Sequence, residues 1–123
     1  MSKNQIAGKY ISSLNDQLGL SIKPQPIYQS KGLKTHMLKS KHYIALKYID
    51  KIPEILVKPD YIGVDRTSES PSIIYIKIYD HNIQLVVKTD SNTKQLYIAT
   101  MYDLPRKKLD RMLYANKVLK VID

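Results

Sequence analysis

The stretch from Ser72 to Tyr102 decides the fold, and it begins Ser72-Ile-Ile-Tyr-Ile-Lys-Ile-Tyr79. β-Branched and aromatic residues dominate this segment, and such residues favour β-strands. Two similar segments follow at 83–89 and 95–102, and short polar stretches between them supply turn residues. Connections this short predict an antiparallel meander, to which residues 61–64 can add a fourth strand.

The region before the meander is expected to be mainly helical. Apolar residues at helical spacing predict an amphipathic helix over 3–18. The segment 22–28 holds two prolines, which make it extended and at best an edge strand. A second helix is expected over 31–48, broken near His42, and a short third one over 53–57, where a proline occupies the first turn.

A last helix is expected to begin at Pro105. The order of elements predicts an α+β fold, with N-terminal helices followed by an antiparallel meander of about four strands and a C-terminal helix. Residues 1–123 are interpreted as one domain. Within it, residues 1–30 form an N-terminal helix and extended segment, and residues 31–113 form the core.

Composition narrows the class of protein. No apolar run approaches the roughly 20 residues that a membrane helix needs, so no membrane partner is expected. The N-terminus lacks the hydrophobic region of a signal peptide. The chain has no cysteine, which removes disulfides and thiolate metal sites. A cytoplasmic protein is the simplest interpretation.

Positive charge is concentrated in the expected helices. The formal net charge is +9; residues 31–58 hold seven Lys against two acids, whereas residues 60–103 hold four basic residues against six acids. This distribution favours a polyanionic partner, RNA in particular, although an AT-rich codon bias also produces many lysines. The candidate nucleic-acid-binding residues lie in the helical regions: Lys34, Lys39, Lys41, Lys47, Arg106 and Lys107.

His36 and His42 are candidates for acid–base catalysis, because the ordinary pKa of histidine lies near neutrality. In one straight helix they would lie ~9 Å apart along the axis and ~120° apart around it, which is poor for a shared metal. No metal and no other cofactor is therefore expected. The alternative is that both are surface histidines of a basic helix. His81 lies in an expected turn.

The strands offer three more candidate catalytic residues. Lys77 stands in the middle of an apolar strand, where its charge could stabilise a pentacoordinate phosphorane; Lys88, near a strand end, is the weaker candidate. Thr100 and Tyr102 end the last strand and can donate hydrogen bonds to a phosphate. Strand pairing is not given by the sequence, so whether Lys77 and Thr100 share a face of the sheet stays open.

Taken together, several motifs resemble the phage barnase–EndoU–colicin–RelE-like nuclease family. They are Lys34-Thr-His-Met37, Lys41-His42, Tyr48-Ile-Asp-Lys-Ile-Pro-Glu-Ile55, Lys58-Pro-Asp-Tyr-Ile-Gly63, the strand with Lys77, and Tyr97-Ile-Ala-Thr-Met-Tyr102. The resemblance spans about residues 31–113.

This resemblance implies a small nuclease of phages and mobile elements, with helices before a four-stranded meander. It implies metal-independent RNA cleavage by a histidine, Lys77 and Thr100. The histidines are spaced slightly wider than in the family pattern, which leaves open whether His36 or His42 holds the family's role.

The leading hypothesis is therefore a metal-independent, toxin-like endoribonuclease in a bacterial or phage-infected cell. RNA is the expected partner, and a cognate inhibitor protein is a second one to consider. The alternative is a non-catalytic nucleic-acid-binding module, or a phage accessory interaction module, on the same scaffold. Convergence of a histidine, Lys77 and Thr100 on one cleft would favour the enzyme.

Overall fold

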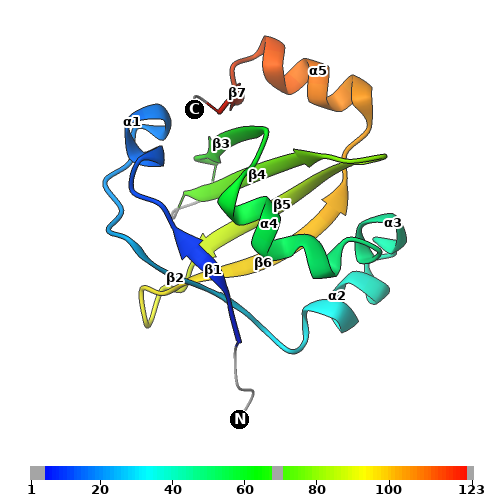
Figure 1. Cartoon of the computed structure of the whole chain (residues 1–123), viewed down its shortest axis with the longest axis horizontal. Coiled ribbons are helices and arrows are strands. Elements are labelled where there is room, and N and C mark those ends of the chain that lie inside the picture. Colours follow the sequence, from blue (N-terminus) through cyan, green and yellow to red (C-terminus); the bar gives the residue numbers. More distant parts are fainter. Residues whose placement is uncertain (1–4, 68–70, 122–123) are drawn as a thin grey trace.

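The structure, a computed structural model, describes residues 5–67 and 71–121 of the chain. Within these residues, seven strands form one mixed sheet in the order β1-β2-β6-β5-β4-β3-β7 (Figure 1). The strands are β1 (Gln5–Tyr10), β2 (Gln25–Gln29), β3 (Tyr61–Asp65), β4 (Ser72–Ile78), β5 (Asn82–Thr89), β6 (Leu96–Asp103) and β7 (Val118–Lys120). The helices are α1 (Leu14–Leu18), α2 (Leu33–Lys39), α3 (Tyr43–Leu46), α4 (Ile52–Val57) and α5 (Arg106–Tyr114), with a 3-10 turn, η1 (Ile49–Lys51).

The middle of the sheet is the predicted meander. Strands β4, β5 and β6 pair antiparallel in sequence order, with Lys77 opposite Ile83 and Val86 opposite Thr100. β3 pairs antiparallel with β4, and β7 pairs antiparallel with β3 at one edge. The pairing predicted for the three central strands is therefore confirmed.

The predicted architecture as a whole is wrong. The protein is mostly β, a mixed seven-stranded sheet with short helices, and not a set of N-terminal helices followed by a four-stranded meander and a C-terminal helix. β1 and β2 extend the sheet beyond β6, and β2 runs parallel to β6 through Ile27 and Tyr28. Such pairings join segments far apart in the sequence, so local periodicity carries no sign of them.

The N-terminal helix predicted over 3–18 is replaced by β1 and the five-residue helix α1, apart from residues 3 and 4, which lie outside the described part. A bulge between Ile6 and Gly8 shifts the register of β1. As a result Ala7 and Tyr10, three residues apart, are both buried, a spacing that imitates a helix. Gly8 packs so closely on α4 that a Cβ would lie 2.7 Å from a methyl group of Leu56.

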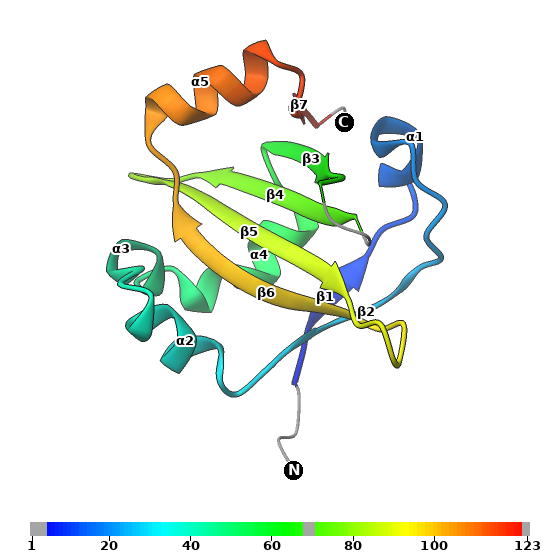
Figure 2. The same cartoon turned by 180° about the vertical axis from the view of Figure 1, so that it is seen from behind.

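The two faces of the sheet are covered differently. On one side, which we call the covered face, α4 crosses the strands (Figure 1), and Ile55 and Leu56 pack in one core with Tyr75, Leu85 and Met101. The opposite side, the open face, carries α5 only near β3 and β4, over a smaller core of Ile74, Ile76, Leu104, Leu109 and Val118. Seen from that side, no helix crosses the middle of β5 and β6 (Figure 2).

Candidate active site

His36 lies on α2 and His42 lies at the junction of α2 and α3, and both helices lie along the edge of β6. β2 pairs with β6 at only two positions, and α2 and α3 contact β6 beyond that point (Figure 2). The helical region breaks near His42, as predicted, because Lys41 adopts a left-handed conformation with φ 59°. Met37 and Ala45 anchor the two helices in the core, so His36 and His42 are held at the border of the open face.

The strand residues of the site follow from register. Gln84 lies opposite Tyr102 and Val86 opposite Thr100. Because side chains alternate between faces along a strand, Gln84, Val86, Thr100 and Tyr102 all belong to the open face. Ala99 has no partner at a bulge in β6, which shifts the register so that Val87 lies opposite Ile98.

These residues border a cleft of about 420 Å³ on the open face. Its lining comes from α2, from the strands β3 to β6 and from the segment after β3: His36, Asp65, Thr67, Ser72, Ile74, Gln84, Val86, Lys88, Ala99, Thr100 and Tyr102. The cleft therefore joins an imidazole, a phenol, hydroxyls, an amide and an ammonium group from segments that are distant in the sequence.

The histidines and Tyr102 form a cluster of rings at one end of the cleft. The ring of His42 lies between the other two, with centroids 6.4 Å from His36 and 5.4 Å from Tyr102. The His36 and His42 planes are nearly perpendicular, at 85°. His36 is exposed and lines the cleft, whereas His42 is half-buried behind it.

Tyr102 is held by a residue that the sequence analysis missed. Gln84 is 4% exposed, and its Nε2 donates a hydrogen bond to the Tyr102 hydroxyl oxygen at 2.5 Å. Burial, and then the negative charge of Asp65, raise the pKa of Tyr102. The phenol is therefore protonated at neutral pH, and its own proton is free to be donated. A polar residue in an otherwise apolar strand, Ile83–Val87, was the available signal.

Polar atoms around Tyr102 lack partners. Among the described residues, four buried side-chain atoms have no hydrogen-bond partner, and three of them are His42 Nδ1, Gln84 Oε1 and Thr100 Oγ1. An unpaired buried polar group costs about 1–3 kcal/mol, so a cluster of three calls for a reason. A bound polar ligand can supply the missing partners after small side-chain rotations.

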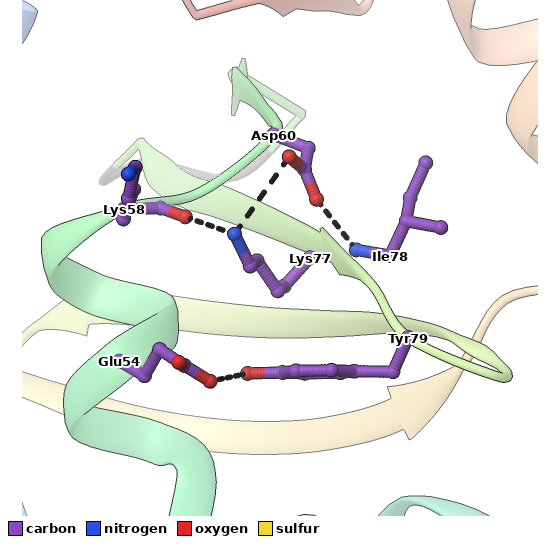
Figure 3. A network of polar contacts seen from close by, with 6 residues as sticks. All are labelled: Glu54, Lys58, Asp60, Lys77, Ile78 and Tyr79. Carbon is purple, nitrogen blue, oxygen red and sulfur yellow. Dashed lines mark hydrogen bonds and ion pairs between the residues drawn. The ribbon is translucent and has the colours of Figure 1, made fainter.

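Lys77 is not part of this cleft. It points from the covered face, where its Nζ donates a hydrogen bond to the Lys58 carbonyl at 2.9 Å and pairs with Asp60 Oδ1 at 3.7 Å (Figure 3). The other oxygen of Asp60 accepts a hydrogen bond from the Ile78 amide at 2.8 Å. Lys77 thus fastens the connection between α4 and β3, and it does not converge with Thr100.

The covered face, on which Lys77 lies, also holds a second pair of polar side chains, Tyr79 and Glu54. The Tyr79 hydroxyl donates a hydrogen bond to Glu54 at 2.5 Å (Figure 3), and the Tyr79 ring stacks on Tyr48. Burial and the Glu54 carboxylate raise the pKa of Tyr79. These contacts join α4 and η1 to the β4–β5 hairpin, and every polar group drawn in Figure 3 except the Lys58 side chain has a partner there.

The matching family model is described as phage-Barnase-EndoU-ColicinE5/D-RelE like nuclease3, and it matches residues 5–111. The chain belongs to this family. The match confirms the resemblance found in residues 31–113 and extends it to β1 and β2. Searches among curated proteins and among solved structures found nothing that matches the chain. Membership of the nuclease family implies nucleic acid as the class of substrate.

The family motifs also have structural roles here. Asp60, in the Pro-Asp-Tyr-Ile-Gly motif, receives the Lys77 and Ile78 contacts described above. Gly63 has no room for a side chain, because a Cβ would lie 2.2 Å from the Lys117 carbonyl oxygen beside β7. This part of the family pattern therefore specifies how the strands join.

The six predicted nucleic-acid-binding residues lie on two sides of the open face. Lys34 and Lys39 belong to α2, and Lys41 and Lys47 follow α2 and α3. Arg106 and Lys107 begin α5, where Arg106 pairs with Asp110 at 3.1 Å. All six side chains are exposed. Two further basic residues, Lys108 in α5 and Lys117 in the turn after it, line a second depression that lies beside the cleft on the open face.

Within residues 5–67 and 71–121, no group of three His, Cys, Asp or Glu side chains is arranged to hold a metal ion. None of the helices in that part of the chain has the length and apolar character needed to cross a membrane.

Proposed function

We propose that this member of the nuclease family is a ribonuclease that cleaves RNA without a metal ion, in the cleft on the open face. The observation that supports it is the meeting of His36, His42, Thr100 and Tyr102 in one place. Four of the five residues picked from the sequence as catalytic come together there, although they come from α2, from the junction between α2 and α3, and from the last strand of the meander.

The proposed reaction uses the ribose as its own nucleophile. His36, exposed in the cleft, removes the proton of a 2′-OH, and that oxygen attacks the adjacent phosphorus. A new bond from the 2′-oxygen to phosphorus forms and the bond to the 5′-oxygen breaks. The products are a 2′,3′-cyclic phosphate end and a 5′-hydroxyl end.

Tyr102 is the proposed acid for the leaving oxygen. Its hydroxyl already accepts a hydrogen bond from Gln84, so its own proton can be donated to the leaving 5′-oxygen. The phenolate that forms is stabilised by the Gln84 N–H. A leaving alkoxide is far more basic than a phenolate, so a raised pKa of Tyr102 still permits this transfer.

His42 is the proposed positioning residue. Its ring contacts the rings of both His36 and Tyr102, and it is not among the residues that line the cleft. We assign it the task of orienting the base and the acid relative to each other. On this proposal His36, and not His42, is the group that contacts RNA.

Lys88 and Thr100 are the proposed stabilisers of the phosphorane. Lys88 is exposed at the cleft, and the Thr100 hydroxyl has no other partner within the described residues. Positive charge and a hydroxyl donor placed where negative charge develops lower the barrier of phosphoryl transfer. Lys88 takes the role that the sequence analysis gave first to Lys77.

The test is incubation of the purified chain with a fluorescent RNA oligonucleotide in excess EDTA, followed by analysis of the fragment ends. We expect cleavage with 2′,3′-cyclic phosphate ends, and no cleavage where the 2′-OH of the cleaved nucleotide is replaced by hydrogen. Cleavage that requires a divalent cation, or cleavage of DNA, would contradict the mechanism.

A second candidate is a nucleic-acid-binding module without catalysis. The exposed lysines and arginine on both sides of the open face favour it independently of the cleft. Binding by either candidate should weaken steeply with salt, because several phosphate contacts release counterions. Salt-sensitive binding with intact RNA after long incubation would favour the module.

A further inference from the structure

A second hollow adjoins the cleft on the far side of Tyr102. It has a volume of about 320 Å³ and shares Asp65, Thr67, Ile74, Gln84 and Tyr102 with the cleft. Its remaining walls come from β3 and Arg66 just after it, and from α5 and the turn after that helix, which border this end of the open face (Figure 2). A strand of RNA with a phosphate in the cleft can therefore place a neighbouring nucleotide in the hollow.

The lining of this hollow combines an apolar wall with a carboxylate. Ile74 and Met112 provide apolar surface that suits the flat face of a ring, and the Met112 side chain is flexible and its thioether polarisable. Lys108 and Lys117 add positive charge to the walls. The Lys108 ammonium lies 6.0 Å from the centre of the Tyr102 ring, and Tyr102 lines both the hollow and the cleft, so Lys108 is near the path of a linking phosphate.

Asp65 is arranged to accept one more hydrogen bond. Its Oδ1 accepts the Thr67 amide at 2.9 Å and the Thr67 hydroxyl at 2.7 Å, and these bonds lower the pKa of Asp65. The carboxylate is therefore charged at neutral pH. Within the described residues, Oδ2 receives no hydrogen bond, so a donor on the ligand can use it.

We infer that this hollow binds the nucleobase next to the cleaved phosphate and selects bases that carry an exocyclic amino group, through Asp65. Adenine, guanine and cytosine present an exocyclic N–H donor of this kind, whereas uracil has no amino group and its single N3–H is flanked by two carbonyl oxygens that a carboxylate repels. The position next to the cleaved bond rests on the proposed function; binding of the base itself can be measured without cleavage.

The test uses 2′-fluoro trinucleotides, which cannot be cleaved because they lack the 2′-OH. The middle base is varied in matched pairs that differ by the amino group: adenine against unsubstituted purine, and guanine against hypoxanthine, with uracil as a third comparison. We expect the amino-bearing member to bind about tenfold more tightly, the size of one hydrogen bond to a charged group.

Asp65→Asn should abolish this preference. It should weaken binding of the amino-bearing trinucleotides, which lose a hydrogen bond, and somewhat strengthen binding of the others, because a negative charge is removed from a basic surface. Asp90→Asn is the matched control: Asp90 makes the same kind of contacts, to Asn92 and Thr93 in the β5–β6 turn, and it does not line either hollow. Asp90→Asn removes the same charge and should keep the preference.

Methyl resonances of labelled methionine locate the base. Met112 should shift when an amino-bearing trinucleotide binds, whereas Met37 and Met101, buried in the other core, should not. Equal affinity within each pair, a preference that survives Asp65→Asn, or no binding of any trinucleotide would overturn the inference. Cleavage of RNA in EDTA without base preference would overturn it and leave the proposed function standing, whereas base preference without cleavage would do the reverse.

Discussion

The two faces of the sheet carry similar polar side chains, but they differ in how many of these have hydrogen-bond partners within the protein. On the covered face, Lys77 and Tyr79 have protein partners, the Lys58 carbonyl, Asp60 and Glu54, and among the described residues only the buried Tyr75 hydroxyl of that core has none. On the open face, polar atoms of His42, Gln84 and Thr100 have none within the described residues. Groups that satisfy one another hold a fold together, whereas groups left unsatisfied beside a cleft are available to a ligand.

This contrast gives Lys77 a structural role away from the cleft. A lysine inside an apolar strand does need a reason, but the reason here is the carbonyl and carboxylate of the connection into β3. Lys88, eleven residues later in the sequence, belongs to the face with unsatisfied groups and lines the cleft. If the faces differ in this way, substitutions at Lys77 and Tyr79 should change the stability of the fold, and substitutions around the cleft should change the rate of RNA cleavage.

Replacing His36 should have the largest effect on the rate of RNA cleavage. His36→Ala should lower the rate of RNA cleavage in EDTA by about 10²–10⁴-fold, because the base is lost. Single-turnover cleavage of a fluorescent oligonucleotide measures it. His81→Ala is the control, since His81 lies exposed in the β4–β5 turn and contacts Tyr48; its rate should not change. An undiminished rate in His36→Ala would contradict the proposal that cleavage takes place in the cleft on the open face with His36 as the base.

His42→Ala should have a smaller effect than His36→Ala, and a different one. Because His42 acts through its neighbours, its removal should change the dependence of rate on pH as well as the rate. Added imidazole should restore part of the activity of His36→Ala, where the base is missing, and not of His42→Ala. Rescue of both variants would instead give His42 a direct contact with RNA.

Replacing one lysine on each face compares directly how the two faces contribute to the rate of RNA cleavage. Lys88→Met should slow cleavage roughly a hundredfold, through loss of charge stabilisation of the phosphorane. Lys77→Met should leave the rate within a few-fold when assayed well below its unfolding temperature. The reverse result would return Lys77 to the catalytic role predicted from the sequence and would break the comparison.

Stability should show the opposite pattern. Lys77→Met leaves the Lys58 carbonyl and Asp60 without their partner, which costs about 1–3 kcal/mol, toward the lower end because Asp60 is partly exposed. Lys88→Met should stay within about 0.5 kcal/mol of the original chain. Urea unfolding followed by circular dichroism gives both values, and equal losses would show that Lys88 also supports the fold.

The smallest effect concerns Tyr79. Its pKa is raised in the folded protein, so its contribution to stability is present below its ordinary value of 10.0 and is lost as pH rises through the higher, folded value. Tyr79→Phe should therefore be less stable by about 1 kcal/mol near neutral pH, and this deficit should shrink above pH ~10. Tyr114 is 92% exposed, and Tyr114→Phe should show no such change with pH.

The sequence by itself determined the central strands, the break near His42 and the choice of His36, His42, Thr100 and Tyr102 as candidates. These depend on local properties: β-propensity, turn residues and the chemistry of single side chains. The family motifs were also readable there, because a resemblance compares residues in order and needs no partners in space.

Only the tertiary structure decided where these residues point. The bulge in β1 gave a strand the spacing of a helix, and the pairing of β2 with β6 joined segments about seventy residues apart. Register then placed Lys77 and Thr100 on opposite faces and brought Gln84 under Tyr102. A shift of one residue in register moves a side chain to the other face, and pairing between distant strands leaves no local trace in the sequence.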